Sequence, residues 1–162
     1  MNPPGHPLDD DDDDDTTIPG LTREGRVLVA EDDPAMRELV VDILVADGRE
    51  VIEVGSGEEL LRVVGERSLA AWPDDAFGVI VTDHRMPNGN GLDVVERLRG
   101  AGCTTPILLI TAFGDDRLRA RADELDTMVM SKPFPLRAFR SAVSVLFSLH
   151  PSRLGGRWRR PS

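Results

Sequence analysis

The chain has 162 residues, of which 40% are hydrophobic, so it is long enough for one domain with a real core and short for two. Its formal net charge of −10 argues against a nucleic-acid-binding domain. No apolar run approaches the roughly 20 residues that span a bilayer, and the first residues lack the basic and apolar regions of a secretory signal. Cys103 is the only cysteine, which excludes an internal disulfide and fits a cytoplasmic protein.

The two ends of the chain carry opposite charge. Residues 1–22 contain an unbroken run of aspartates, Asp9–Asp15, which repel one another, so we expect a disordered acidic arm there. Residues 151–162 form an arginine-rich basic tail. Composition favours solvated ends for both segments. An interaction or metal-attracting role of the arm stays open, as do contacts of the tail with acidic lipids, nucleic acid or the aspartate run.

Between residues 23 and 150, short apolar runs alternate with segments of helical spacing. The first apolar run is 27–30, and the segment 34–47 then repeats apolar residues, among them Leu39, at helical spacing. Asp33 is a good N-cap for this helix, Pro34 a good first residue and Gly48 a good terminator. Further strands are predicted at 51–54, 77–82, 106–111 and 127–130, and further helices at 57–67, 92–99, 115–125 and 135–149.

The order of these elements predicts the fold class. The almost continuously apolar segment 77–82 is typical of a strand buried on both faces. Asn90 is a suitable cap for the helix at 92–99, and Leu136 begins the apolar stripe of the last helix. Five strands alternating with five helices predict an α/β fold, a doubly wound five-stranded parallel sheet with helices on both faces. Ligands of such folds bind beyond the carboxyl ends of the strands.

Charged and hydroxyl side chains stand at these strand ends. Glu31 and Asp32 follow the first strand, Asp83 the third and Lys132 the fifth, while Thr111 closes the fourth. Clustered carboxylates need a counter-charge, and oxygen ligands at an open rim suit Mg²⁺, which often binds together with a phosphoryl group. A carboxylate in such a place can form an aspartyl phosphate. The rim is therefore a candidate site of phosphoryl transfer, which needs mainly positioning and charge neutralisation.

Lys132 is the only lysine among nineteen basic residues. One explanation is chance. The other is that its site needs a compact ammonium on a flexible stem, which a planar guanidinium does not replace well. We favour the second explanation, because at this rim the ammonium would face a carboxylate and, later, a phosphate.

Four segments resemble the motifs of a known family: VLVAEDDPAMRELV, VIVTDHRMPNGNGLDVV, PILLITAFGD and SKPF. In this order and spacing they resemble the receiver domains of response regulators in two-component signalling, over about residues 25 to 149. The resemblance is to single-domain regulators of the chemotaxis-receiver kind. It implies the flavodoxin-like strand order 2-1-3-4-5.

The resemblance also implies how the acidic residues work. Asp83 would be the phosphoacceptor. Glu31 and Asp32 would be the acidic pair that holds Mg²⁺, with Asp32 the more direct ligand. Asp83 itself and the backbone carbonyl of Arg85 would complete the metal site.

Three further positions receive roles from the resemblance. Thr111 would be the switch hydroxyl that bonds a phosphoryl oxygen. Ala112 would be the small residue that keeps the site accessible to the phosphoryl group. Lys132 would bind the phosphate, and the bond to Pro133 stands where receivers often have a cis peptide, which is almost confined to proline.

The chain departs from the family pattern in the region that reads out the signal. Receivers usually carry Tyr or Phe three residues before the lysine, where this chain has Val129. The stretch LDTM, Leu125–Met128, replaces the usual Gly-Ala-Asp-Asp. Arg85 and Phe113 occupy positions that tune the lifetime of the phosphate in the family. These departures concern readout and lifetime rather than phosphorylation itself.

We therefore expect a single-domain response regulator that accepts a phosphoryl group on Asp83 from a histidine kinase or a phosphotransfer protein and signals through protein contacts. It would catalyse nothing beyond its own phosphoryl transfer. No DNA-binding domain and no membrane span are expected, and a homodimer formed on phosphorylation stays open. The family usually signals through its fourth helix, fifth strand and fifth helix; here that face carries Arg117, Arg119 and Arg121, which would suit an acidic partner.

Two alternatives come from other classes of protein. A docking module with the same fold could signal without phosphate, a hypothesis that Val129 and the LDTM stretch motivate. A Mg²⁺-dependent phosphatase of the haloacid dehalogenase type could work through an aspartyl phosphate, but such enzymes carry a second aspartate two residues after the nucleophile. This chain has Arg85 there, which argues against the phosphatase.

Overall fold

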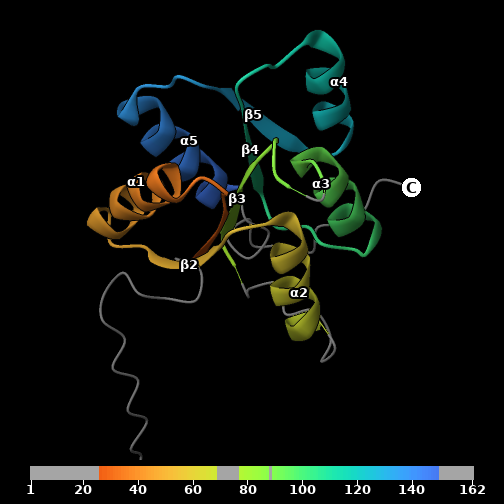
Figure 1. Ribbon diagram of the computed structural model, residues 1–162, viewed down its shortest axis with the longest axis horizontal. Helices are drawn as coiled ribbons and strands as arrows, with labels where there is room; N and C mark the ends of the chain where they lie inside the picture. The colour runs from red at the N-terminus through yellow and green to blue at the C-terminus, as the bar shows by residue number, and fades with distance from the viewer. Residues whose placement is uncertain (1–25, 69–76, 88, 150–162) are drawn as a thin grey trace, which may run out of the picture.

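The computed structural model describes residues 26–68, 77–87 and 89–149 (Figure 1). The predicted acidic arm at 1–22 and the predicted basic tail at 151–162 lie outside the described residues. Among the helices of the described part, none has both the length and the apolar character to cross a membrane.

Five parallel strands form one sheet in the order β2-β1-β3-β4-β5, which confirms the predicted fold class and strand order. The three central strands are buried along almost their whole length, because helices cover both faces of the sheet. The two edge strands are only partly buried. The bounds are β1 (Arg26–Ala30), β2 (Glu50–Val54), β3 (Val79–Asp83), β4 (Ile107–Thr111) and β5 (Thr127–Ser131).

Five helices alternate with the strands, and hydrophobic cores on both faces of the sheet hold them there. Helices α1 and α5 share one core, which includes Phe139 and Phe147, while α2 and α3 share the other, which includes Leu60 and Val95. Helix α4 packs beside β5 (Figure 1). The bounds are α1 (Pro34–Ala46), α2 (Gly57–Ser68), α3 (Gly91–Gly100), α4 (Asp116–Glu124) and α5 (Leu136–Ser148).

The helix ends follow the predicted capping chemistry. Asp33 caps α1 by accepting a hydrogen bond from the backbone N–H of Ala35 at 3.0 Å. Asn90 caps α3 in the same way, from Asp93 at 2.8 Å. After α1, Gly48 has φ +79°, the left-handed conformation that a glycine adopts without strain. Asp33 and Asn90 thus begin helices after the carboxyl ends of β1 and β3, whereas Gly48 ends α1 before β2.

Two residues that we predicted on apolar stripes are exposed instead. Leu39 of α1 is 44% exposed and Leu136 of α5 is 48% exposed. The buried side of α1 is the narrower stripe of Val40, Ile43 and Leu44, so Leu39 lies outside the contact although it keeps helical spacing with Ile43. Leu136 is the first residue of its helix, at the end of the buried stripe. Periodicity alone overestimates the width of a buried face.

Candidate phosphoryl-transfer and metal site

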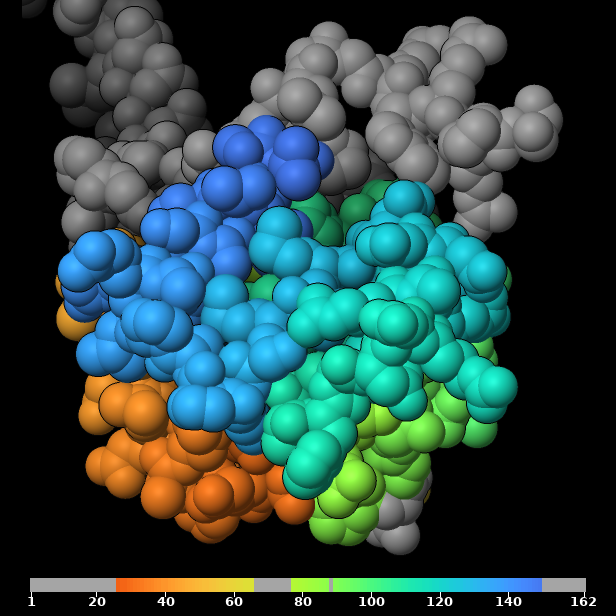
Figure 2. All heavy atoms as spheres, turned by 90° about the horizontal axis from the view of Figure 1, so that it is seen from above, coloured from red at the N-terminus to blue at the C-terminus, as the bar shows by residue number. Residues whose placement is uncertain are grey.

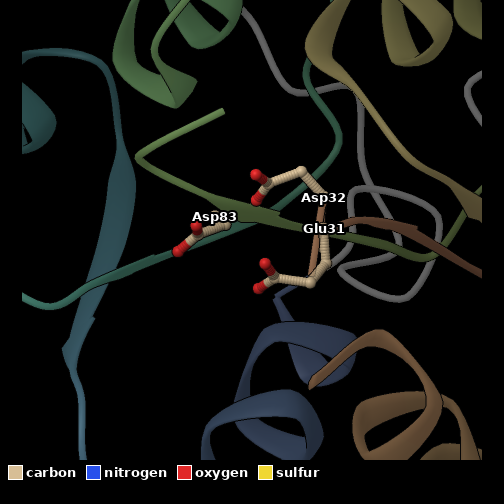
Figure 3. A group of neighbouring side chains, drawn as sticks. All are labelled: Glu31, Asp32 and Asp83. Atoms are coloured by element: carbon tan, nitrogen blue, oxygen red, sulfur yellow. The ribbon is translucent and has the colours of Figure 1, made fainter. Parts of the chain in front are cut away.

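The predicted site residues lie at one edge of the sheet. Asp83 is the last residue of β3 and Thr111 the last of β4, while Glu31 and Lys132 directly follow β1 and β5. Because all strands are parallel, their carboxyl ends meet at this edge. Figure 3 shows the carboxylates of Glu31, Asp32 and Asp83 projecting into a common region beside β3.

The three carboxylates form a compact cluster, with one oxygen of each within 4.8 Å of the others. Glu31 and Asp83 are buried, with 4% and 7% of their surface exposed, whereas Asp32 is exposed. Burial, followed by the negative charge of Asp83, raises the pKa of Glu31. Burial also raises the pKa of Asp83, although hydrogen bonding to Lys132 opposes the shift. The cluster is thus held together against its own repulsion.

Lys132 supplies a positive charge to this cluster. Its Nζ lies 3.0 Å from Oδ1 of Asp83 and 3.4 Å from Oε2 of Glu31. Burial alone would lower the pKa of Lys132, but the bonds and charges of Asp83 and Glu31 outweigh it and raise the pKa. Its backbone N–H donates to the carbonyl of Thr111 at 2.7 Å, and the peptide bond to Pro133 is cis. The only lysine of the chain therefore contacts the carboxylate of Asp83.

The loop after β1 is held by two hydrogen bonds to Glu31. The backbone N–H of Asp33 donates to its side-chain oxygen at 3.2 Å. A guanidinium nitrogen of Arg37 donates to its backbone carbonyl at 2.8 Å. Arg37 could not be predicted as a site residue, because nothing in a helical pattern shows that a side chain of α1 reaches back to the end of β1. Arg37 is a positioning residue for the acidic pair.

The loop after β3 is pinned next to the phosphoacceptor candidate. The backbone N–H of Gly91 donates to the carbonyl of His84 at 2.7 Å. A Cβ on Gly91 would collide with the backbone carbonyl of Asp83, so only glycine allows this close approach. His84 is half-buried, and burial lowers its pKa. His84 lies in the loop directly after β3.

The residues after β4 line the open side of the site. Thr111 is buried, and its hydroxyl oxygen accepts a hydrogen bond from the backbone N–H of Phe113 at 3.1 Å. Ala112 is exposed, and Phe113 is 69% exposed. The guanidinium of Arg85 lies 4.8 Å from the centre of the Phe113 ring, a cation–π contact across two loops. The roles of Thr111, Ala112 and the Arg85 carbonyl stay predictions.

The donor set fits a hard divalent cation. Three carboxylates face one ammonium, so the described cluster has a net charge of about −2 when all groups are ionised. Carboxylate oxygens within reach of one another at a partly open rim are the ligands that Mg²⁺ prefers, because it retains several waters. Exposed Asp32 is the most accessible of the three. The residues present therefore fit Mg²⁺ on the strength of their chemistry and spacing.

Known regulators resemble this chain in sequence. It is 34% identical over 122 residues to the response regulator protein FleR of Pseudomonas aeruginosa, which covers 74% of this chain and 24% of FleR. It is 30% identical over 115 residues to the transcriptional regulatory protein FixJ of Bradyrhizobium diazoefficiens, covering 70% of this chain and 52% of FixJ. The chain thus spans about a quarter to about half of the length of these relatives.

Solved structures and a family comparison agree with the fold. The non-phosphorylated HemR receiver domain of Leptospira biflexa is 27% identical, with a TM-score of 0.65, covering 85% of this chain and 98% of that one. The receiver domain of the hybrid histidine kinase CckA is 25% identical, with a TM-score of 0.60, covering 76% of this chain and 99% of that one. The family model of the response regulator receiver domain matches residues 27–144. With the acidic cluster and its lysine at the carboxyl edge of a 2-1-3-4-5 sheet, the chain belongs to the response regulator receiver domain family.

Proposed function

We propose that this receiver domain accepts a phosphoryl group on Asp83 from a histidine kinase or a phosphotransfer protein. The observation that carries the proposal is the position of the Asp83 carboxylate, buried in the acidic cluster and 3.0 Å from the only lysine of the chain. A carboxylate held in this way is oriented and has a cation ready for the charge that phosphorylation adds.

The transfer step can be written for the residues of this chain. An oxygen of Asp83 attacks the phosphorus of a phosphohistidine, the new P–O bond forms as the P–N bond breaks, and the electron pair leaves on the imidazole nitrogen. Lys132 then pairs with a phosphoryl oxygen, and the hydroxyl of Thr111 turns to donate to another. Ala112 adds no bulk in the path of the donor. When bound, Mg²⁺ would neutralise the negative charge of the phosphoryl oxygens.

The partners follow from the family and from chemistry. One relative, 27% identical over 121 residues, is the sensor histidine kinase RcsC of Salmonella typhi, and FixJ is a transcriptional regulator by name. We propose that this receiver works in the cytoplasm, through contact with another protein. Apart from its own phosphorylation we assign it no catalytic activity. Formation of a homodimer on phosphorylation remains part of the proposal to be tested.

A second candidate function is docking that does not depend on phosphate. Val129, half-buried on β5, motivates it, because the aromatic residue of the usual receiver switch is absent there. The phosphatase alternative gains no support, because exposed Arg85 stands where its general acid would be required.

Intact-mass spectrometry with Mg²⁺ and acetyl phosphate tests the proposal. We expect the wild type and Asp42→Asn, an exposed aspartate of α1, to gain one phosphoryl group, and Asp83→Asn to gain none. If the wild type gains no phosphoryl group and forms no beryllofluoride adduct, the docking function replaces the proposal. Equal phosphorylation of Asp83→Asn would move the acceptor to another residue.

A further inference from the structure

Arg119 of α4 reaches the end of β5 beside the candidate site. One of its guanidinium nitrogens donates to the side-chain oxygen of Ser131 at 2.7 Å. Ser131 is the last residue of β5 and precedes Lys132. Figure 2 shows that α4 and β5 (teal to cyan) and α5 (blue) form one continuous face of the molecule. This hydrogen bond therefore joins two elements of that face next to the phosphate-binding lysine of the proposed function.

The same guanidinium is packed close to Thr111 through Gly114. An ideal Cβ on Gly114 would lie 3.2 Å from the methyl carbon of Thr111 and 3.3 Å from a terminal nitrogen of Arg119. The methyl group of Thr111 and the guanidinium of Arg119 therefore both lie close to Gly114, on the side where a Cβ would stand. Since Thr111 is buried and its methyl group lies beside Gly114, a movement of Thr111 would displace this loop next to the exposed Arg119.

The strand register places these groups on one face of the sheet. Thr111 pairs directly with Ser131, and Leu109 pairs with Val129. Paired residues of neighbouring strands point to the same face, as do residues two apart on one strand. Val129 is the small half-buried residue at the position of the missing aromatic. In place of an aromatic residue at position 129, the long side chain of Arg119 extends from α4 to this face, close to Thr111.

We propose that Arg119 is the positioning residue that couples Thr111 to the surface of α4 and β5, in place of an aromatic relay. The proposal rests on the proposed function, because phosphorylation of Asp83 is what moves Thr111. The hydroxyl oxygen of Thr111 now accepts from Phe113, and a hydrogen bond donated to a phosphoryl oxygen would draw the side chain toward Asp83. Its methyl group then shifts against Gly114, and the hydrogen bond between Arg119 and Ser131 is released.

Release would change which charges this surface presents. Arg121 is already held by Glu96 at 2.8 Å and by Glu124 at 2.6 Å, so its charge is neutralised in place. Arg119 is held only by the hydroxyl of Ser131 among the described contacts, which leaves its charge uncompensated. Release frees the guanidinium nitrogen that Ser131 holds, so that it can pair with a carboxylate of a partner. Arg119 is therefore the α4 arginine whose availability depends on the state of the site.

The first test needs no phosphate. In the unmodified protein, Thr111→Ser keeps the hydroxyl that holds Phe113 and removes the methyl group that lies beside Gly114. We expect the Nε–H resonance of Arg119 in the NMR spectrum to shift, while that of Arg62, an exposed arginine of α2, stays in place. An unmoved Arg119 resonance would overturn the coupling.

The second test measures beryllofluoride affinity in the presence of Mg²⁺. If the bond to Ser131 is present only without phosphate, removing it favours the phosphorylated form, because a ligand shifts an equilibrium toward the state that it binds better. Ser131→Ala and Arg119→Met should both bind about 2- to 10-fold tighter, and the control Arg62→Met should match the wild type. Unchanged or weaker binding in both variants would overturn the proposal. A wild type that binds no beryllofluoride contradicts the proposed function alone, and the resonance of Arg119 still decides the coupling.

Discussion

Asp83 carries a negative charge that its surroundings do not fully neutralise. Its carboxylate is buried near two others, and the single ammonium of Lys132 is shared with Glu31. The pKa of Asp83 is therefore raised, and burial is the largest cause of the shift. At the scale of single residues, the metal-free site therefore keeps a net negative charge at the expense of stability.

Asp83→Asn should stabilise the metal-free protein at neutral pH. The substitution removes a charge whose ionisation is less favourable in the folded than in the unfolded chain. We expect a gain of about 1 kcal/mol, which corresponds to a rise in Tm of about 2 to 4 °C. Thermal denaturation measures it, with Asp42→Asn as the exposed control. A lower Tm for Asp83→Asn would show that the ion pair with Lys132 outweighs burial.

This stability difference should depend on pH with a definite sign. Because the folded-state pKa of Asp83 lies above the ordinary 3.8, the folded chain binds more protons between the two values, and its stability falls as pH rises through that window. Thermal melts of the wild type and of Asp83→Asn should therefore coincide at the acid end and separate as pH rises. A difference that shrinks with rising pH would contradict the assigned direction of the pKa shift.

Lys132→Arg tests why the chain keeps one lysine. A guanidinium carries the same charge but is larger and planar, so it does not occupy the place of an ammonium between Asp83 and Glu31. We expect phosphorylation by acetyl phosphate to slow about 10-fold or more while the fold is kept. Intact mass against time provides the rates, and circular dichroism provides the control for folding. An unchanged rate would favour chance as the explanation for the single lysine.

At the scale of elements, Arg99 joins α3 to the turn between α4 and β5. Its guanidinium donates to the carbonyls of Cys103, Thr105, Leu125 and Asp126, at 2.8 to 3.0 Å. Asp126 has φ +49°, a left-handed conformation that aspartate tolerates better than most residues. The unusual LDTM stretch is thus ordered by an arginine from another helix.

Arg99→Met should cost stability without changing the site. Four carbonyl groups lose a charged donor, so we expect about 2 to 4 kcal/mol of destabilisation in urea denaturation. The affinity for Mg²⁺ should remain that of the wild type, because the described hydrogen bonds of Arg99 do not involve Glu31, Asp32 or Asp83. Arg97→Met, on the exposed side of the same helix, should stay within about 0.5 kcal/mol. If Arg97→Met were equally destabilised, the hydrogen bonds of Arg99 would not be the cause.

The predictability of the fold differs between kinds of feature. Caps such as Asp33 and Asn90 could be predicted because capping is chemistry local to a few residues. Leu39 could not be placed correctly, because the width of a buried stripe depends on what packs against it. Arg37 and Arg99 escaped prediction because their partners lie on other elements, and long side chains leave no periodic signal.

At the scale of the whole molecule, the parallel sheet brings residues far apart in sequence to one edge. Glu31 and Lys132 are 101 positions apart and lie within 3.4 Å. This convergence was predictable because alternating strands and helices are compatible with few sheet topologies. In each of these, the strands are parallel and their carboxyl ends lie at one edge. The hydrogen bond between the Thr111 hydroxyl and Phe113 could not be predicted, since it depends on the conformation of the loop after β4.

Mg²⁺ should stabilise the whole fold through this edge. A ligand that binds only the folded chain adds about 2.7 kcal/mol at a concentration of 100 times its Kd. We expect Mg²⁺ to raise the Tm of the wild type and not that of Asp32→Asn. The neighbouring Asp33→Asn is the matched control, because asparagine caps α1 as well as aspartate does. A full response of Asp32→Asn to Mg²⁺ would remove Asp32 from the metal site.

The central claim is that Asp83 is the residue that carries the phosphoryl group. The most direct measurement is reduction of the phosphorylated protein with borohydride, which converts an aspartyl phosphate to homoserine, followed by peptide mass spectrometry. We predict homoserine at position 83 alone, and only after incubation with both Mg²⁺ and acetyl phosphate. Homoserine at another aspartate, or none in a protein that has gained mass, would contradict the assignment of Asp83 and of the site built around it.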